Sequence, residues 1–384
     1  MKGFILFFLA LLNFLFNICI HAQDKQSIHV TFIMTSQGLT GDSTVFITGG
    51  MNQLGNWDPG KVKMIYRGDH TWVREIMISK PVTIEYKYTL GSWDREGANA
   101  NGETFPNFEA KISRDTIIKD QVPDWTSKKP WEIKPTVTGT IRFHRGMKGT
   151  RLKDRDIIVW LPPDYDKDKN KHYPVVYMQD GQNIFDAATS AYGAEWRIDE
   201  TADSLIKTGK IPPVIVVGIY NTPDRMDEYI PGKKGTAYMD FMVKRLKPFI
   251  DSAYRSMPDA KHTIVGGASA GGTISFMLVW EHPDIFSKAI CMSSAFKTTS
   301  IDCVAPVKKY SGKKKPIFFY IDIGGVGLES ELLPGNDEMI SVLKEKGYRE
   351  GIDFVYFRDP SAKHFETDWA KRFPGAIILC LPGE

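Results

Sequence analysis

Apolar and polar residues alternate with a period of two through the first third of the chain. Runs of this kind cover 28–33, 44–47, 72–76 and 83–88, and clusters of Gly, Asn and Asp separate them. Because side chains of a strand point to opposite faces in turn, this pattern predicts short strands with one buried face. A length of about 95 residues suits one small domain. We therefore predict an all-β sandwich over residues 23–121.

The pattern changes from residue 139 onward. Continuous apolar runs at 156–161, 174–178 and 214–219 alternate with helical patterns such as 238–254. Strands that are apolar on both faces are typical of a mostly parallel sheet covered by helices on both sides. Residues 122–138 are rich in Pro and also contain Trp, which favours a linker. We predict an α/β domain over residues 139–384.

The first 22 residues have the pattern of a secretory signal peptide. Lys2 is followed by an apolar run over 4–12, and Ala22 is a small residue at the expected cleavage position. The run is shorter than the roughly 20 residues that span a bilayer. We expect a secreted or periplasmic protein with no membrane attachment after cleavage; an uncleaved anchor is the alternative.

Composition excludes several classes of protein. Charged residues make up 25% and hydrophobic residues 42%, and Lys plus Arg number 49 against 46 for Asp plus Glu. This balance is that of a globular protein without a basic surface for nucleic acid. Beyond the signal peptide the cysteines are Cys291, Cys303 and Cys380. Their odd number predicts buried thiols, with a Cys291–Cys303 bridge as the alternative. No metal-ligand spacing occurs, so we expect no metal or organic cofactor.

The strongest chemical motif is Gly-x-Ser-x-Gly at Gly267, Ser269 and Gly271. It follows a β-branched run and precedes an apolar helical pattern over 273–280, which is the context of a nucleophile elbow. The sharp turn strains the serine backbone and leaves no room for side chains two positions away. We predict Ser269 as a catalytic nucleophile; a glycine-rich packing turn is the alternative.

A serine nucleophile needs a histidine base, which in this motif's fold comes later in the chain. Only His282 and His364 follow Ser269. His282 lies at the far end of the helix that begins at the serine, well over ten ångströms away at about 1.5 Å per residue. His364 lies in a polar loop directly after the apolar run 354–357, so we predict it as the base.

The acid that orients the histidine is expected in the loop after the strand at 316–321. Glu329 is our choice, ahead of a helix that we expect to begin near Asn336, and Glu331 and Asp322 remain alternatives. The oxyanion of an acyl-transfer reaction also needs donors. We predict the backbone N–H groups of Ala270, directly after the nucleophile, and Gln182, in the loop after 174–178.

Several segments after residue 139 resemble the esterase D-like group of α/β-hydrolases, which includes feruloyl, acetylxylan and enterochelin esterases and S-formylglutathione hydrolases. The matching positions are 173–177, 180–185, 218–219, Asn221, Arg225, 267–272, His364 and Trp369. The resemblance implies Ser269 as nucleophile and His364 as base. Its acid usually follows a strand-end Gly-x-x-Glu/Asp, and the segment 324–329 is longer than that pattern.

The N-terminal domain resembles the starch-binding modules of carbohydrate-binding family 20. The resemblance is carried by residues 49–59 with Trp57, by Trp72, and by 85–88. It implies that Trp57 and Trp93 stack on glucose rings and that Lys87 bonds hydroxyl groups, with Trp72 in the core. A spacer that no longer binds glycan is the alternative.

These patterns together predict a secreted serine carboxylic ester hydrolase with a glycan-binding module. We expect a polysaccharide or oligosaccharide ester as substrate, carrying an acetyl or feruloyl group, and a starch-like glycan at the N-terminal domain. The alternatives are a siderophore trilactone esterase and a non-catalytic glycan-binding protein on a hydrolase scaffold.

Overall fold

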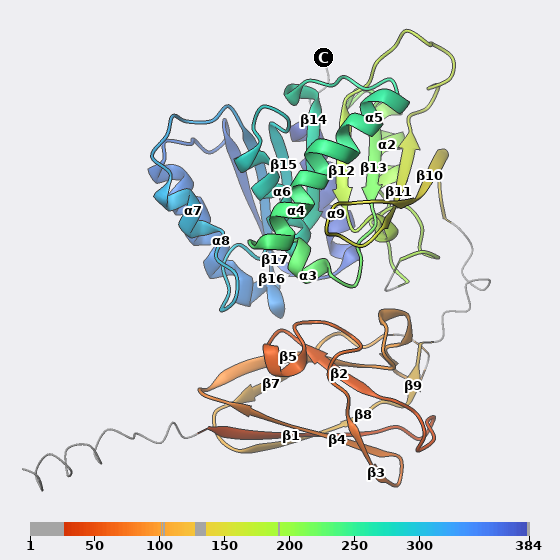
Figure 1. Ribbon diagram of the computed structural model, residues 1–384, viewed down its shortest axis with the longest axis vertical. Helices are drawn as coiled ribbons and strands as arrows, with labels where there is room; N and C mark the ends of the chain where they lie inside the picture. The colour runs from red at the N-terminus through yellow and green to blue at the C-terminus, as the bar shows by residue number, and fades with distance from the viewer. Residues whose placement is uncertain (1–26, 101, 103, 127–135, 191–192, 382–384) are drawn as a thin grey trace, which may run out of the picture. The chain divides into compact units, whose positions relative to one another are not determined.

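The computed structural model describes residues 27–100, 102, 104–126, 136–190 and 193–381. The chain divides into two compact units, Met1–Ser127 and Lys128–Glu384 (Figure 1). The predicted signal peptide and most of the predicted linker lie outside the described residues. None of the described helices has the length and apolar character needed to cross a membrane.

The N-terminal unit is built from β-strands. They are β1 (Ile28–Thr35), β2 (Phe46–Gly49), β3 (Ile65–Gly68), β4 (Thr71–Ile78), β5 (Val82–Thr89), β6 (Gly97–Ala98), β7 (Phe108–Ile112), β8 (Thr116–Gln121) and β9 (Asp124–Trp125). One sheet has the order β3-β4-β1-β8, a second has the order β2-β5-β7, and β6 pairs with β9. Two short 3₁₀ turns, η1 (Asn52–Leu54) and η2 (Trp93–Arg95), lie in the loops.

The core of this unit lies between its two larger sheets. Burial alternates residue by residue along β1, as the period-two pattern predicts. Phe32 of β1 meets Tyr86 of β5 edge to face, with ring centroids 4.9 Å apart. The unit extends beyond the predicted boundary at residue 121, because Trp125 is buried and its indole N–H donates to Ser36 Oγ at 2.8 Å. Residues 122–126 are thus part of this unit.

The C-terminal unit contains one sheet of eight strands. They are β10 (Thr140–Met147), β11 (Arg155–Leu161), β12 (Val175–Gln179), β13 (Ile215–Ile219), β14 (Thr263–Ala268), β15 (Lys288–Met292), β16 (Phe318–Val326) and β17 (Phe354–Lys363). Their order is β10-β11-β13-β12-β14-β15-β16-β17. The pairs β10–β11 and β11–β13 are antiparallel, and the remaining pairs are parallel. The sheet is thus mostly parallel, as predicted.

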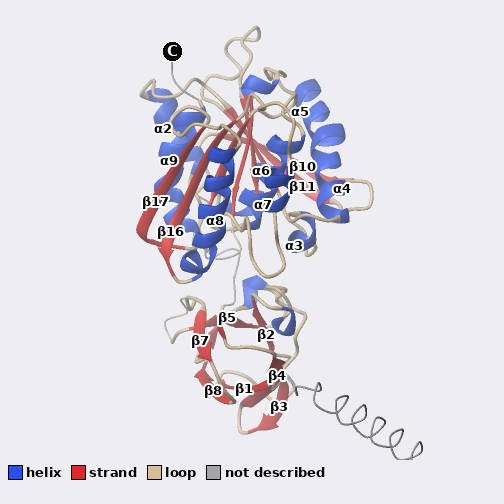
Figure 2. Ribbon diagram, turned by 90° about the vertical axis from the view of Figure 1, so that its left-hand side faces the viewer, coloured by secondary structure: helices blue, strands red, loops and turns tan. Residues whose placement is uncertain are grey.

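Helices cover both faces of this sheet (Figure 2). The helices are α2 (Ile198–Lys207), α3 (Arg225–Glu228), α4 (Lys233–Phe241), α5 (Lys247–Ala253), α6 (Ala270–Glu281), α7 (Val304–Lys309), α8 (Leu328–Glu345) and α9 (Glu366–Cys380). Two short 3₁₀ turns, η3 (Gly181–Asn183) and η5 (Ala260–His262), and a π-helical segment, η4 (Met242–Leu246), complete the unit's helical elements. One apolar cluster joins the sheet to α4–α8 and another joins it to α2 and α9. The sheet is therefore buried on both sides, which explains its continuous apolar strands.

The cysteines of the described residues are buried and free. Cys291 lies in β15 and Cys380 ends α9. They act as small apolar core residues, and the alternative Cys291–Cys303 bridge is not formed.

Candidate active site

Ser269 lies between β14 and α6 in a strained backbone conformation. Its φ of 57° and ψ of −128° are unusual for a residue with a side chain. A Cβ added to Gly267 would lie 2.8 Å from the carbonyl carbon of Gly271, and one added to Gly271 would lie 3.1 Å from Cβ of Gln179. Gly267 therefore has no room for a side chain, and Gly271 has little.

The sheet topology brings distant parts of the chain to one edge. Strands β14, β15, β16 and β17 are parallel neighbours, so their carboxyl ends share an edge. Ser269 follows β14, Ser293 follows β15, Glu329 follows β16 and His364 follows β17. The backbone N–H of Ser269 donates to the Met292 carbonyl at 2.9 Å, which joins the elbow to the end of β15. By contrast, His282 ends α6, away from this edge.

Glu329 and His364 form a hydrogen-bonded pair. His364 Nδ1 lies 3.2 Å from Glu329 Oε1, and the Gly324 N–H donates to Glu329 Oε2 at 2.8 Å. The Glu329 side chain is fully buried. Burial by itself would raise the pKa of Glu329, but its interactions with His364, together with hydrogen bonds from Ser293 and Gly324, hold this pKa below its ordinary value. The carboxylate is therefore kept charged beside the imidazole.

The two alternative acids have other surroundings. Asp322 is buried and accepts hydrogen bonds from Arg372 Nε at 3.0 Å and Arg372 Nη2 at 3.1 Å. Glu331 is exposed on α8. This helix begins at Leu328 and not near Asn336, so Glu329 belongs to its first turn and not to a loop. A carboxylate there is also favoured by the helix dipole.

Ser293 connects the Glu329–His364 pair to buried residues of α9. It was not among the site residues predicted from the sequence. Its hydroxyl oxygen accepts hydrogen bonds from Trp369 Nε1 and Arg372 Nη2, both at 2.9 Å. Its one proton is then available to Glu329, with which the hydroxyl is hydrogen-bonded. Trp369 also meets the His364 ring edge to face at 4.9 Å. The signal that would have found Ser293 is its place directly after β15, beside the elbow strand.

The two predicted oxyanion donors lie in neighbouring segments. Ala270 is the first residue of α6, where backbone N–H groups have no carbonyl partner within the helix. Gln182 lies in η3, directly after β12. The loop that carries it is tied down by Asp180, which accepts hydrogen bonds from Arg225 at 2.7 Å and from Asn221 at 2.6 Å. Asp180 thus has a structural role in holding this loop.

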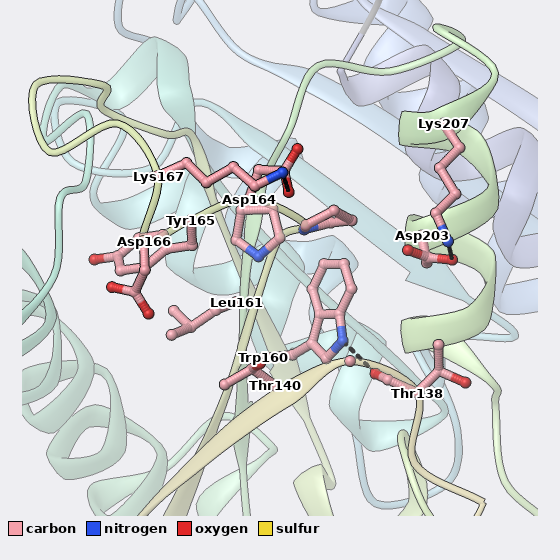
Figure 3. A pocket seen from close by; sticks show the side chains of 13 residues that line it. Thr138, Thr140, Trp160, Leu161, Asp164, Tyr165, Asp166, Lys167, Asp203 and Lys207 are labelled. Atoms are coloured by element: carbon pink, nitrogen blue, oxygen red, sulfur yellow. Dashed lines mark hydrogen bonds and ion pairs between the residues drawn. The ribbon is translucent and has the colours of Figure 1, made fainter.

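A cleft separate from the candidate active site is shown in Figure 3. It is lined by residues around the end of β11, such as Trp160 and Leu161, and by Asp203 and Lys207 of α2. Trp160 pairs with Val216, near the start of β13, whereas Ser269 follows the carboxyl end of β14. The cleft therefore lies near the amino ends of the parallel strands, whereas Ser269 lies at their carboxyl ends. None of the predicted catalytic residues lines the cleft.

The N-terminal unit brings its two candidate sugar-stacking residues together. The rings of Trp57 and Trp93 lie with centroids 6.4 Å apart and planes inclined by 37°, and both side chains are half-buried. Trp72 is in the core, as predicted. Lys87 Nζ lies 3.0 Å from Glu96 Oε2, and the Lys87 side chain is only 9% exposed. Lys87 therefore presents little surface to a ligand.

The eight-stranded sheet, its helices on both faces and the serine elbow define an α/β-hydrolase. The chain belongs to the family described as "Putative esterase", whose model matches residues 151–378. A second family model, "Starch binding domain", matches residues 27–121. Both predicted family resemblances and the predicted fold class are confirmed. An esterase domain implies an ester substrate, and a starch-binding domain implies a glycan ligand.

The chain is also similar to individual proteins and solved structures. The uncharacterized protein YjcH of Bacillus subtilis is 25% identical over 201 residues, which are 52% of this chain and 78% of YjcH. A solved ferulic acid esterase has a TM-score of 0.53 at 19% identity and covers 63% of this chain and 98% of its own. The ferric enterobactin esterase of Salmonella typhimurium also has a TM-score of 0.53, at 13% identity, over 93% of this chain and 94% of its own. At these identities the structures share the fold.

Proposed function

We propose that the protein is a serine carboxylic ester hydrolase that acts through an acyl-enzyme at Ser269. The observation that carries this proposal is the Glu329–His364 hydrogen bond at the sheet edge where the strained Ser269 elbow also lies. Glu329 bonds Nδ1 of His364, which leaves Nε2 as the nitrogen that serves the serine. The buried carboxylate stabilises the imidazolium that forms when the serine proton is taken.

The reaction follows from these roles. Ser269 Oγ attacks the ester carbonyl carbon while its proton passes to His364, and the Ala270 and Gln182 N–H groups stabilise the oxyanion. The carbon–oxygen bond of the alcohol then breaks, and the alcohol leaves with the proton from His364. Water, deprotonated by His364, attacks the acyl-enzyme and releases the carboxylic acid and free Ser269. None of these steps requires a metal or an organic cofactor.

We assign a carbohydrate ester as the substrate, with an acetyl or feruloyl group on an oligosaccharide or polysaccharide. The support is the starch-binding domain at residues 27–121, because a module that holds a glycan raises the concentration of its ester groups near the enzyme. The Trp57–Trp93 pair supplies flat apolar surfaces of the kind that stack on sugar rings. Export by the predicted signal peptide would bring the enzyme to such polymers.

The catalytic assignment is tested by Ser269→Ala. We expect turnover of p-nitrophenyl acetate to fall by about 10³-fold or more, because no other group supplies the nucleophile. Ser275→Ala is the control in the same helix: this hydroxyl is buried and donates a hydrogen bond to the Gly271 carbonyl within α6. Equal turnover by S269A and the parent protein would refute Ser269 as nucleophile.

The substrate assignment is tested by comparing acetylated xylan, feruloylated oligosaccharides and a ferric trilactone as substrates of the purified protein. We expect release of acetate or ferulate and no preference for the trilactone. Preferential hydrolysis of the trilactone would favour a siderophore esterase. Absence of turnover on all three and on p-nitrophenyl acetate would favour a non-catalytic glycan-binding protein.

A further inference from the structure

Three carboxylates gather at the start of α2, outside the candidate active site. Glu195 precedes the helix, and Asp199 and Glu200 belong to its first turn. One oxygen from each lies within 4.8 Å of the others. Glu195 and Asp199 are 7% and 0% exposed, and Glu200 is half-buried. Such a cluster has the composition of a site for a hard cation.

Each of these carboxylates has one oxygen held by the protein. The Thr138 N–H donates to Asp199 Oδ2 at 2.6 Å, and the Thr136 hydroxyl donates to Glu195 Oε1. Arg197 Nε lies 3.3 Å from Glu200 Oε1. The second oxygens, Glu195 Oε2, Asp199 Oδ1 and Glu200 Oε2, are buried and have no hydrogen-bond donor among the described residues.

The unpaired oxygens carry an energetic cost. Buried carboxylates are normally paired with cations or bound to metals, because they lose their hydration. Among the described residues, Arg197 forms an ion pair with Glu200 of this cluster, and the Arg197 side chain is 66% exposed. Within the part of the chain that the structure describes, the cluster therefore has no buried cation to compensate its charge.

We propose that Glu195, Asp199 and Glu200 bind a calcium ion through their unpartnered oxygens. Calcium prefers carboxylate ligands at about 2.3–2.6 Å, so ligands on opposite sides of one ion lie about 4.6–5.2 Å apart. The 4.8 Å limit on the separations within the cluster is compatible with this distance. The cluster has no His or Cys, which zinc would favour. Water completes the coordination.

The bound ion would stabilise the corner where the chain enters the hydrolase unit. Thr136 and Thr138, just before β10, bond the same carboxylates that would hold the ion. The adjacent Trp196 packs on Trp369 with ring centroids 5.5 Å apart. The role is structural, since none of the three ligands belongs to the proposed catalytic group. The competing account is a proton shared between Asp199 and Glu200.

Terbium luminescence tests the site directly, because Tb³⁺ takes the same oxygen ligands as calcium and is sensitised by a nearby indole such as Trp196. With the full chain freed of metal by a chelator, we expect Tb³⁺ emission on tryptophan excitation and its displacement by excess Ca²⁺. Asp199→Asn removes one charge but keeps an acceptor for the Thr138 N–H, and it should abolish the signal. Asp203→Asn is the matched control on α2, where Asp203 pairs with Lys207 (Figure 3). Equal emission from the parent and D199N would overturn the proposal.

Thermal unfolding provides the second measurement. We expect Ca²⁺ to raise the Tm of the parent protein and D203N by several degrees, since a ligand of the native state stabilises it, and to leave D199N unchanged. Glu195→Gln should likewise show no rise in Tm with Ca²⁺, and this variant is used in place of D199N if D199N does not fold. An equal rise with Mg²⁺ would overturn the assignment to calcium. No Ca²⁺ effect on the parent, with D199N at least as stable, would establish the shared proton instead.

Discussion

The candidate sites of the two units differ in how tightly the fold constrains them. In the hydrolase unit, the proposed catalytic groups follow three different strands, and Glu329 is fixed by contacts to His364, Gly324 and Ser293. In the N-terminal unit, the candidate binding surface is a pair of half-buried indoles, Trp57 and Trp93. Proton transfer depends on the direction of each hydrogen bond, whereas stacking depends on the area of contact.

This difference predicts two kinds of response to mutation. Changes in the hydrolase network should reduce kcat steeply, because a small displacement of a catalytic group removes much of its effect. Changes in the indole pair should weaken glycan binding gradually and leave the turnover of a small soluble ester unchanged. The following predictions test this contrast, beginning with the largest expected effect.

Glu329→Gln should lower kcat for p-nitrophenyl acetate by about 10³–10⁴-fold, because the amide no longer stabilises the imidazolium or its correct tautomer. Glu331→Gln is the matched control, since it makes the same change two residues along α8 on an exposed side chain. We expect E331Q to retain full activity in the same steady-state assay. A larger loss in E331Q than in E329Q would transfer the acid role to Glu331.

Ser293→Ala should lower kcat by about 10- to 100-fold with little change in KM, because Glu329 loses a hydrogen bond that positions it. Ser294→Ala is the control: Ser294 is equally buried, but its hydroxyl has no partner among the described residues. Steady-state kinetics of the two variants give the comparison. Similar kcat values for S293A and S294A would contradict a positioning role for Ser293.

Trp57→Ala should weaken binding to soluble starch by about tenfold or more, which corresponds to about 1.4 kcal/mol of lost stacking. Turnover of p-nitrophenyl acetate should not change. Tyr66→Ala, which removes a 39% exposed aromatic side chain on β3, is the control and should bind as the parent does. Affinity electrophoresis in starch gels measures both. Starch binding by W57A at the parent affinity would refute the stacking surface.

The smallest effect concerns stability and pH. The pKa of Glu329 is lower in the folded protein than its ordinary value of 4.5, so the carboxylate stabilises the fold above pH 4.5. As pH falls below 4.5, Glu329 of the unfolded chain binds a proton first, and the stabilising contribution decreases. It is lost once pH falls below the lowered pKa, because Glu329 of the folded protein is then protonated as well. The difference in unfolding free energy between the parent and E329Q should therefore shrink at acidic pH, as measured by urea denaturation. A difference that grows on acidification would contradict the lowered pKa.

The sequence determined the features that depend on local pattern. Alternation and continuous apolar runs predicted the two units and their fold classes, because burial on one or both faces of a sheet selects those residues. The glycines around Ser269 predicted the elbow, because their need for space is local. The role of His364 as the base was predicted because, in this fold, the histidine comes after the serine in the chain. Glu329 was preferred from its position after a strand, but Asp322 and Glu331 remained open.

Only the tertiary structure decided which side chains meet. The pairing of β16 with β17 brings Glu329 to His364, while Arg372 of α9 pairs with Asp322. Lys87 was predicted to contact glycan, yet its ammonium pairs with Glu96, so that contact stays a prediction. The carboxylate cluster at the start of α2 was not predicted from the sequence. Which of its oxygens lack a hydrogen-bond donor depends on where the surrounding residues lie in the fold. Pairing and burial depend on residues far apart in the chain, and these are set by how the strands and helices pack.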